Sequence, residues 1–453
     1  MNIFTKTSYL TLSLLAVLGE IKAQDLILLH LDESIQYALE NNVAVKNAFL
    51  EIDASKATVG ETTSQGFPQI SANVDVNKNL IIPSQPFPAI FFNPEAAEGE
   101  FIPVQFSPEY TSNMTVTVNQ MIFNGSYFVG LQAARTYKQL AEYDKVKTEY
   151  DVIENVKKAY FSVLVSRERE ELVQANLKRM ETLLKETQVM YETGFSEKID
   201  VSRIKVQYNN LKTELDKARS STQISTELLK LQMGMPLDQP IELAENISDL
   251  EETFEQEIPN QGSGMRRVEL DQLQTNMDLI QLDVRNIKAQ YLPRLDANLN
   301  YSRIGFGSSL NQIFNSQWYP GSVLGVSLQI PIFDGLTKSY QIQRNRVQIK
   351  QFENQIYDQE QRIVSEMFQA RANLKNSLSA LEVQLENRDL AMEVFRTTKI
   401  KYQEGVGSNL EVVEADAALK EAETNYYSAL YDALIARVDL EKALGILKIA
   451  STP

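Results

Sequence analysis

The segment QMIFNG, residues 120–125, decides the fold because it separates two stretches of very different pattern. In residues 114–119 apolar and polar side chains alternate, which indicates a β-strand with one apolar face. Residues 109–235 contain no proline, and no glycine occurs between Gly130 and Gly194. Proline and glycine are the strongest helix breakers, so we predict one helix of about 65 residues and about 100 Å. A strand therefore leads directly into a helix longer than a compact domain requires.

The same order occurs twice in the chain. QMIFNG recurs as IPIFDG at residues 330–335, and YETG at residues 191–194 recurs as YQEG at residues 402–405. These matches keep an offset of 210 or 211 residues, and a second proline-free run covers residues 332–452. Self-similarity at a fixed offset is the signature of a repeat architecture. We predict that each repeat contains a helix, two strands, a long helix, a turn and a shorter helix.

The long helices carry a regular seam. Apolar and small residues recur at steps of four and three, as at Ala370 and Leu374, which is typical of coiled coils. Some seam positions are polar, which favours packing among several neighbouring helices over a dry two-stranded rod. The helices predicted at residues 31–65 and 196–233 are together about as long as the long helix. We expect them to stack end to end beside it, with residues 236–264 at mid-height.

Four short stretches share a period of two: residues 70–77, 114–119, 295–302 and 324–330. Two interpretations compete for them. One is a half-buried sheet in a soluble protein, and the other is an outer-membrane barrel, whose strands need about 9–11 residues. Aromatic residues stand near the strand ends: Phe67, Phe123, Trp318, Tyr319 and Phe333. Such a belt is typical of membrane interfaces, so the pattern favours the barrel.

Residues 1–23 are predicted to be an export signal. The basic Lys6 precedes an apolar run at residues 9–18, which is shorter than the roughly 20 residues of a membrane-spanning helix. The alternative is a buried first helix. The rest of the chain is predicted to divide into a first repeat at 24–235, a linker at 236–264, a second repeat at 265–446 and a tail at 447–453.

Composition argues against an enzyme and against a nucleic-acid-binding protein. The chain has 60 acidic and 44 basic side chains and a net charge of -16, which excludes a broad basic face. It has no cysteine, so disulfides, thiolate metal sites and a lipidated cysteine are excluded. The one histidine, His30, lies near the N-terminus, and no zinc motif, P-loop or nucleophile elbow is found. We expect no catalysis, no cofactor and no metal site.

The ordered set of motifs resembles the TolC-like outer-membrane efflux protein family. The likeness covers residues 31–445 and rests on the duplicated order, the Phe-Asn/Asp-Gly exits from the second strands and the paired turns. It implies a mostly α-helical chain with two β-hairpins, which as a homotrimer forms a 12-stranded barrel in the outer membrane above a long α-helical barrel in the periplasm. It also implies a passive exit duct for a tripartite efflux or type I secretion system. The implied partners are a periplasmic adaptor protein, an inner-membrane pump or ABC exporter, and outer-membrane lipid.

The strands support an oligomer independently of this resemblance. Four strands cannot close a barrel, because the smallest membrane barrels use about eight. Two copies would give eight strands with a filled interior, whereas three would give twelve with room for water. Open strand edges are not tolerated in lipid, so association should be obligate. One rival interpretation is an exported coiled-coil structural or adhesive surface protein, which needs no paired hairpins. Another is a secreted helical enzyme, which needs a catalytic constellation.

The resemblance also implies a gate at the periplasmic tip. It places Glu411 and Glu414 at an acidic constriction, and Tyr402 and Asp200 at latch positions. Glu411 and Glu414 are three residues apart and share one helix face, so a trimer would carry two stacked acidic rings. A structural role competes, because Ser408 and Glu411 also form the pattern of a capping box.

The turns at Gly194, Gly405 and Gly407 are expected at the tip that meets the adaptor. The family pattern often has a basic latch partner at the position of Gly407, so the sequence departs from the family there. At the opposite end, the proline-rich residues 83–109 are predicted to form an extracellular loop between the first two strands.

Overall fold

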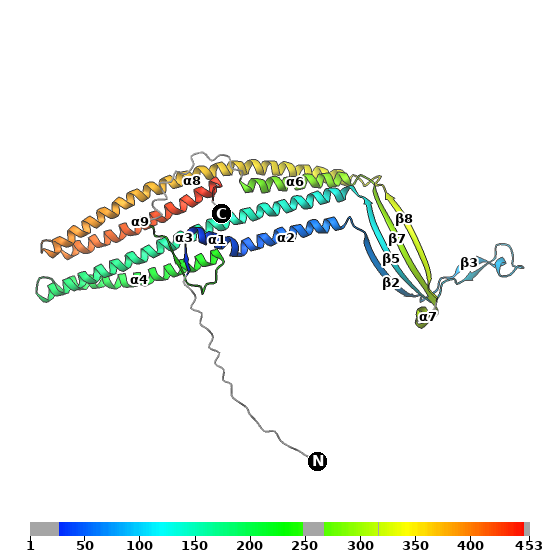
Figure 1. Cartoon of the computed structure of the whole chain (residues 1–453), viewed down its shortest axis with the longest axis horizontal. Helices are drawn as coiled ribbons and strands as arrows, with labels where there is room; N and C mark the ends of the chain where they lie inside the picture. Colours follow the sequence, from blue (N-terminus) through cyan, green and yellow to red (C-terminus); the bar gives the residue numbers. More distant parts are fainter. Residues whose placement is uncertain (1–26, 248–266, 316, 448–453) are drawn as a thin grey trace, which may run out of the picture.

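Two helices of unusual length form the body of the molecule (Figure 1). α3 (Gly125–Glu192) has 68 residues and α8 (Thr337–Gln403) has 67, as the runs without helix breakers predicted. One residue, Asn124, separates α3 from the strand before it, whereas residues 330–336 separate α8 from the strand before it. At the start of α3 the side chain of Asn124 accepts the N–H of Ser126 at 3.0 Å, which satisfies one of the free donors of the first turn.

The computed structural model describes residues 27–247, 267–315 and 317–447. The predicted export signal at residues 1–23 lies outside this part. So do residues 248–264 of the predicted linker and the predicted tail beyond residue 447. None of the helices in the described part is both long enough and apolar enough to cross a membrane.

Shorter helices stack end to end beside α3. They are α1 (Leu31–Asn41), α2 (Val43–Ser64) and α4 (Lys198–Met233). The side chain of Asn42, between α1 and α2, donates to the carbonyl of Gln232 at 2.7 Å, so the end of α4 meets this break. The sequence predicted one helix over residues 31–65. The structure divides it because Asn42 is extended and caps α2 through the N–H of Ala44.

The second half of the chain repeats the arrangement. α6 (Val268–Ala289) and α9 (Asn409–Leu444) both lie along α8 (Figure 1). Gly445 ends α9 with a φ of 68°, and a Cβ there would lie 3.9 Å from Cγ of Arg267, directly before α6. The two helix pairs, α3/α4 and α8/α9, are called the first and second helical hairpins below.

Four antiparallel strands form one sheet in the order β2-β5-β7-β8. They are β2 (Gln69–Lys78), β5 (Tyr110–Phe123), β7 (Arg294–Gly307) and β8 (Tyr319–Gln329). One row of paired residues crosses all four strands: Ile70, Val118, Leu299 and Leu324. Because directly paired residues point to the same side, one face of the sheet is apolar. This agrees with the alternation in the sequence.

The sheet has two open edges. In the described residues, β2 and β8 pair with a neighbour on one side only. At the end of the sheet far from the helices, β3 (Gln85–Pro88) and β4 (Phe101–Val104) form a separate small hairpin (Figure 1). The sequence predicted a loop here. The hairpin forms around Phe87, whose ring centroid lies 5.2 Å from that of Phe91 at the end of η1 (Ala89–Phe91). A short helix, α7 (Leu310–Asn315), joins β7 to β8.

A two-stranded parallel sheet at mid-height was not predicted. It pairs β1 (Ile27–Leu29) with β6 (Ile241–Leu243) and so joins the start of the first repeat to the linker. Glu245 follows β6 and accepts the N–H of Leu31 at 3.0 Å, which satisfies the start of α1. His30 precedes that helix, and its Nδ1 lies 3.3 Å from Glu245. The single histidine, His30, therefore takes part in a structural contact at the start of α1.

The helix seam yields the first prediction. Leu374 is buried together with Ala370 on α8, against Ala436 and Leu440 on α9, as the seam assignment predicted. Leu374→Asp should lower the free energy of unfolding by several kcal/mol, because the new carboxylate is buried without a partner. The control is Asn376→Asp, an exposed position one half-turn on. Thermal unfolding of the two variants tests this prediction. Equal melting temperatures would contradict the assignment of Leu374 to a buried seam between helices.

Candidate functional site

Two turns of the same construction form the far end of the helical hairpins. Gly194 and Gly405 have φ of 82° and 77°, a left-handed conformation that favours glycine. In the first turn the N–H of Phe195 bonds the carbonyl of Met190 at 2.8 Å, and in the second the N–H of Val406 bonds that of Lys401 at 3.0 Å. These bonds close the helix ends in the same way, so the turn residues predicted from the repeat do occupy equivalent turns.

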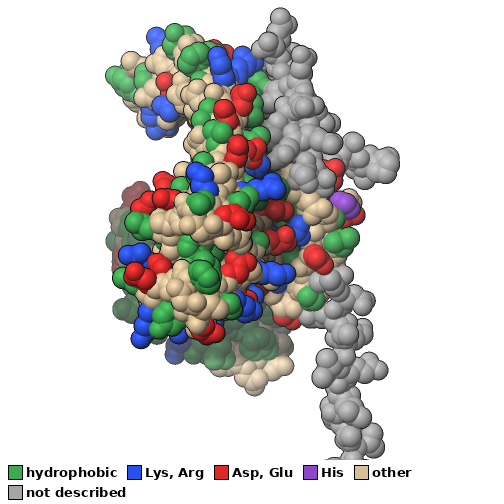
Figure 2. All heavy atoms as spheres, turned by 90° about the vertical axis from the view of Figure 1, so that its left-hand side faces the viewer, with side chains coloured by type: hydrophobic (Ala, Val, Ile, Leu, Met, Phe, Trp, Pro, Cys, Tyr) green, Lys and Arg blue, Asp and Glu red, His purple; other side chains and the backbone are tan. Residues whose placement is uncertain are grey.

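The side chains at the tip are exposed and partly apolar. Phe195 is 82% exposed and Val406 78%, and the next helices begin with the exposed Ile199 and Leu410. Figure 2 views the molecule from this end and shows apolar side chains scattered among acidic and basic ones. Such a mixed surface suits contact with another protein.

A close contact with α8 explains why glycine occupies position 407. A Cβ at this position would lie 3.1 Å from Cβ of Lys401 and 3.1 Å from the backbone nitrogen of Tyr402. Any larger residue would push against the last turn of α8. The departure from the family pattern at this position therefore coincides with a close approach of the turn to α8.

The four predicted gate residues occupy different environments. Glu411 and Glu414 are both exposed on the first turns of α9. The hydroxyl of Ser408 accepts the N–H of Glu411 at 3.3 Å, so the capping interpretation accounts for the serine and leaves the glutamate carboxylate free to face solvent.

Asp200 is occupied within its own turn. Its carboxylate accepts the hydroxyl of Ser196 at 3.0 Å and the N–H of Glu197 at 3.3 Å, and it lies 3.7 Å from Arg203. The geometry is that of a helix cap. Tyr402, the other residue that the resemblance places at a latch position, has a different environment.

Tyr402 joins the two helical hairpins. It is 6% exposed, and its hydroxyl lies 3.5 Å from that of Thr187 on α3. Beside it, Gln403 donates to Glu186 at 3.0 Å, and Lys399 lies 3.9 Å from the same carboxylate. The sequence analysis did not identify Glu186, because nothing in the sequence distinguishes it from the other acidic residues of α3.

Farther from the turns, the two hairpins meet through a set of polar side chains that are buried or, in the case of Arg179, half-buried. It comprises Asn176 and Arg179 on α3 and Asp416 and Glu423 on α9, and it is called the charged contact below. Asn176 donates to Glu423 at 2.9 Å, and Nη2 of Arg179 lies 3.5 Å from Asp416. Asp416 and Glu423 are each 2% exposed. The sequence analysis missed the contact, although Asp416 and Glu423 are seven residues apart and therefore share a helix face.

The charged contact is incompletely satisfied. Nε and Nη2 of Arg179, Oδ1 of Asn176 and Oδ1 of Asp416 are buried without a hydrogen-bond partner. Burial raises the pKa of Glu423, and the nearby Asp416 raises it too. The hydrogen bond from Asn176 and the charges of Arg179 and Lys420 only partly offset this. Buried charges with orphan atoms destabilise a contact relative to apolar packing.

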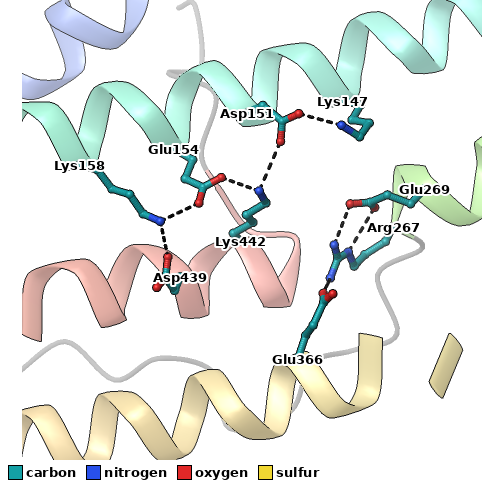
Figure 3. A network of polar contacts seen from close by, with 9 residues as sticks. All are labelled: Lys147, Asp151, Glu154, Lys158, Arg267, Glu269, Glu366, Asp439 and Lys442. Atoms are coloured by element: carbon teal, nitrogen blue, oxygen red, sulfur yellow. Dashed lines mark hydrogen bonds and ion pairs between the residues drawn. The ribbon is translucent and has the colours of Figure 1, made fainter. Parts of the chain in front are cut away.

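A second network ties the helices together at mid-height (Figure 3). Lys442 of α9 lies 3.3 Å from Asp151 and 2.5 Å from Glu154, both on α3. Lys158 of α3 then lies 2.8 Å from Glu154 and 2.6 Å from Asp439 of α9. Acids and bases alternate, so each charge faces at least one opposite charge.

The start of α6 is held to α8 in the same region. Arg267 lies 2.7 Å from Glu269 and 2.6 Å from Glu366 (Figure 3). A cavity of about 440 Å³ is lined by both Arg267 and Lys442. Its charged walls are already paired with one another, which argues against a ligand site. Among the described residues, no group of three or more His, Cys, Asp or Glu side chains could hold a metal ion.

Sequence comparisons identify relatives over most of the chain. A family model described as Outer membrane efflux protein matches residues 34–235 and 265–446. The Outer membrane protein TolC of Vibrio cholerae serotype O1 is 23% identical over 345 residues, which cover 73% of this chain and 76% of that protein. The Pyoverdine export outer membrane protein OpmQ of Pseudomonas aeruginosa is 21% identical over 426 residues, 92% of this chain and 85% of that protein.

Solved structures share the fold. The CmeC outer membrane channel of Campylobacter jejuni superposes with a TM-score of 0.71 at 15% identity, covering 93% of this chain and 87% of that one. The MtrE outer membrane channel of Neisseria gonorrhoeae, solved in an open state, gives a TM-score of 0.70 at 17% identity, covering 93% and 91%. The repeated helical hairpins and the sheet described above therefore belong to a known architecture.

The mid-height network predicts a loss of stability in acid. Burial raises the pKa of Asp151 and Glu154, but hydrogen bonds from Lys147, Lys158 and Lys442 outweigh burial and hold the pKa values below the ordinary 3.8 and 4.5. A depressed carboxylate pKa stabilises the fold above the ordinary value, and this stability is lost as pH falls through the folded value.

Lys442→Met should therefore lower the free energy of unfolding by about 1 kcal/mol at neutral pH. The difference from the parent should shrink as pH falls below about 4 and through the lowered pKa values of Asp151 and Glu154 in the folded parent, because protonation removes the charge pairs that Lys442 makes. Thermal unfolding of the two proteins across pH 2–7 measures this. A difference that stays constant with pH would show that Lys442 acts by packing and not by charge.

Proposed function

The chain belongs to the outer membrane efflux protein family, and from that premise we propose that three copies form an exit duct through the outer membrane and into the periplasm. The observation that carries the proposal is the sheet. In the described residues it has four strands, one apolar face and two open edges, and its strands lead into helices of 68 and 67 residues. Members of this family are outer-membrane channels and not enzymes.

The number of copies follows from the sheet. An open edge exposes unpaired N–H and C=O groups, and in lipid these groups find no water. Going round the proposed ring, the strands alternate in direction, so β8 of one copy can pair antiparallel with β2 of the next. Three copies supply about twelve strands, which leaves a water-filled interior, whereas about eight strands fill with side chains.

The apolar face supports the proposed placement in lipid. Ile70 is 72% exposed and Leu324 76% in the single chain, and both lie on the face that a barrel would turn toward the membrane. An exported coiled-coil structural or adhesive protein, the alternative from the sequence, gives no reason for such a face or for its continuity with both long helices.

The helical part would cross the periplasm and receive cargo. We place the turns at Gly194, Gly405 and Gly407 at the end that meets a periplasmic adaptor protein, where the exposed Phe195 and Val406 supply apolar contact area. The energy source would be an inner-membrane efflux pump or an ABC exporter, so the chain itself would conduct passively. Relatives are named for export and secretion, which supports a tripartite efflux or type I secretion role.

Near this end we place the gate. Glu411 and Glu414 project from one face of α9 and are exposed in the single chain. In a trimer they would form two acidic rings, and such rings favour cations. Tyr402 would help to hold the closed state through Thr187. Asp200 would contribute by fixing the neighbouring turn through its capping bonds.

The duct proposal is tested by locating and recording the protein. The full chain, expressed with its N-terminus intact, should remain in outer membranes after a high-salt wash and migrate as a trimer in mild detergent. In planar bilayers the purified protein should produce discrete ion-conducting events. A soluble or salt-extractable monomer without conductance would contradict the duct and favour the surface-protein alternative.

The gate is tested with the double variant Glu411→Gln, Glu414→Gln. Glutamine keeps the size and removes the charge, so folding should survive with at most about 1 kcal/mol lost in capping. Single-channel recording of the parent should show cation selectivity and block by multivalent cations added at the tip side. Both should weaken strongly in the double variant. If selectivity and block are unchanged, these glutamates do not line the constriction, which then lies elsewhere.

A further inference from the structure

We propose that α7 and Arg303 form a binding site, on the outside of the sheet, for a phosphorylated glycolipid of the outer leaflet of the outer membrane. The site lies at the end of the sheet far from the helices, where α7 joins β7 to β8 (Figure 1). The inference rests on the proposed duct, whose apolar sheet face would meet lipid. It adds a contact surface that neither conduction nor the acidic rings require.

α7 packs against the apolar face of the sheet. On β7, Leu299, Gly305 and Gly307 are an even number of residues apart, so their Cα substituents point to one face. A Cβ on Gly305 would lie 3.2 Å from the ring of Trp318, and one on Gly307 would lie 3.1 Å from the backbone nitrogen of Ile313. Glycine at these two positions therefore makes room for α7 and Trp318 on the face that carries Leu299.

α7 has one buried side and one exposed side, and both are apolar. Ile313 is 0% exposed beneath the helix, and Nε1 of Trp318 donates to its carbonyl at 3.1 Å. Leu310 and Phe314 are four residues apart, so they share a helix face. They are 53% and 67% exposed. The helix is thus fixed to the sheet and offers apolar contact area to a partner outside the chain.

The sheet face beside α7 carries a cation without an acidic partner. Arg303 pairs directly with Met114 and Pro320 of the neighbouring strands, and it shares its face with Leu299. Its Nε donates to the hydroxyl of Tyr301 at 3.0 Å. In the part of the chain that the structure describes, its guanidinium makes no ion pair with a carboxylate. A cation turned toward lipid is costly without an anion, so an anionic headgroup is the partner that this position calls for.

The spacing along β7 puts Arg303 at headgroup level. The outward face of this strand reads Leu295, Ala297, Leu299, Tyr301 and Arg303. It is apolar up to Leu299 and polar beyond. A tilted strand crosses the hydrocarbon core in about 9–11 residues, which is the span from Leu295 to Arg303. In the proposed barrel Arg303 would therefore meet phosphates, and α7 would lie farther out, among sugars.

The residues around α7 suit a saccharide. Residues 304–333 contain no charged side chain, so this segment does not repel a phosphate. Asn311, Gln312 and Asn315 are exposed on α7, and their amides can bond sugar hydroxyls. The ring of Phe314 offers a flat apolar surface to a sugar ring. Lys78 lies on the same sheet face, but Glu109 at 3.3 Å already pairs with it.

A second copy of the chain is a poorer occupant of this surface. α7 contacts β5 and β7, which are the two central strands of the sheet. The seam between copies in the proposed ring runs between β8 of one copy and β2 of the next. Closing the ring would therefore leave α7 and Arg303 exposed to the membrane.

The test uses the full-length protein in phosphatidylcholine vesicles, with and without lipid A, an acylated and phosphorylated glucosamine disaccharide. Trp318 is the only tryptophan of the chain, so tryptophan emission reports on this site alone. Lipid A should shift this emission and should stay bound when the protein is re-extracted in mild detergent. Phosphatidylglycerol at equal charge should be retained several-fold less, because it offers one phosphate and no sugar rings.

Two variants with matched controls locate the site. Arg303→Gln should lower lipid A retention several-fold and remove the emission shift. Its control is Arg294→Gln, on the opposite face of the same strand beside Asp296, which should change neither. Phe314→Ser should also lower retention, whereas Phe101→Ser, 59% exposed on the separate β3–β4 hairpin, should not.

Each other outcome overturns a stated part of the account. Equal retention of lipid A by the parent and Arg303→Gln would remove the site, and equal retention of phosphatidylglycerol would show attraction by charge alone. Loss of the trimer in Phe314→Ser with lipid A still bound would assign α7 to protein contact. A parent that conducts as a trimer but binds no lipid A contradicts the glycolipid site and leaves the duct intact. A parent that neither inserts nor conducts contradicts the duct itself.

Discussion

The open edges of a four-stranded amphipathic sheet are the constraint on which the rest of the structure depends. Within the described ranges, each edge strand has a row of backbone groups without strand partners, and the face between the edges is apolar. Water can hydrogen-bond such an edge, which then remains a template for pairing with another chain, whereas lipid offers it no partners. In the proposed trimer, ring closure would remove both edges and turn the apolar face toward lipid. Because each strand of the sheet joins a helix at one of its ends, closing the sheet would also arrange the helices in a ring.

Helix length follows from the same arrangement. Each long helix runs the full height of the helical part, and two shorter elements cover that height beside it. Where these shorter helices meet, their end groups need hydrogen-bond partners, since helix ends leave backbone N–H and C=O groups unpaired. In the first repeat Asn42 provides such a partner by donating to a carbonyl at the end of α4. In the second, Arg267 and Lys442 supply charge pairs that bind the ends of α6 and α9 to α8 and α3.

Features set by local pattern could be predicted from the sequence. The absence of proline and glycine indicated the two long helices, and the alternation of side chains indicated the strands and their apolar face. Features set by contacts between distant segments could not be predicted. The break at Asn42 and the pairing of β1 with β6 depend on residues 190 and 214 positions away. The charged contact is of the same kind, because Arg179 shows its role only when α9 lies opposite. At the tip, the resemblance suggested a latch at Asp200, while the structure gives that residue a cap.

The central claim is that the sheet closes only through other copies of the chain. Native mass spectrometry of the full-length protein, extracted from outer membranes in mild detergent, tests this most directly. The account predicts a complex of three copies that does not dissociate to folded monomer without unfolding of the sheet. A monomer that keeps its strands in detergent would contradict it, because its two edges would then be stable without partners.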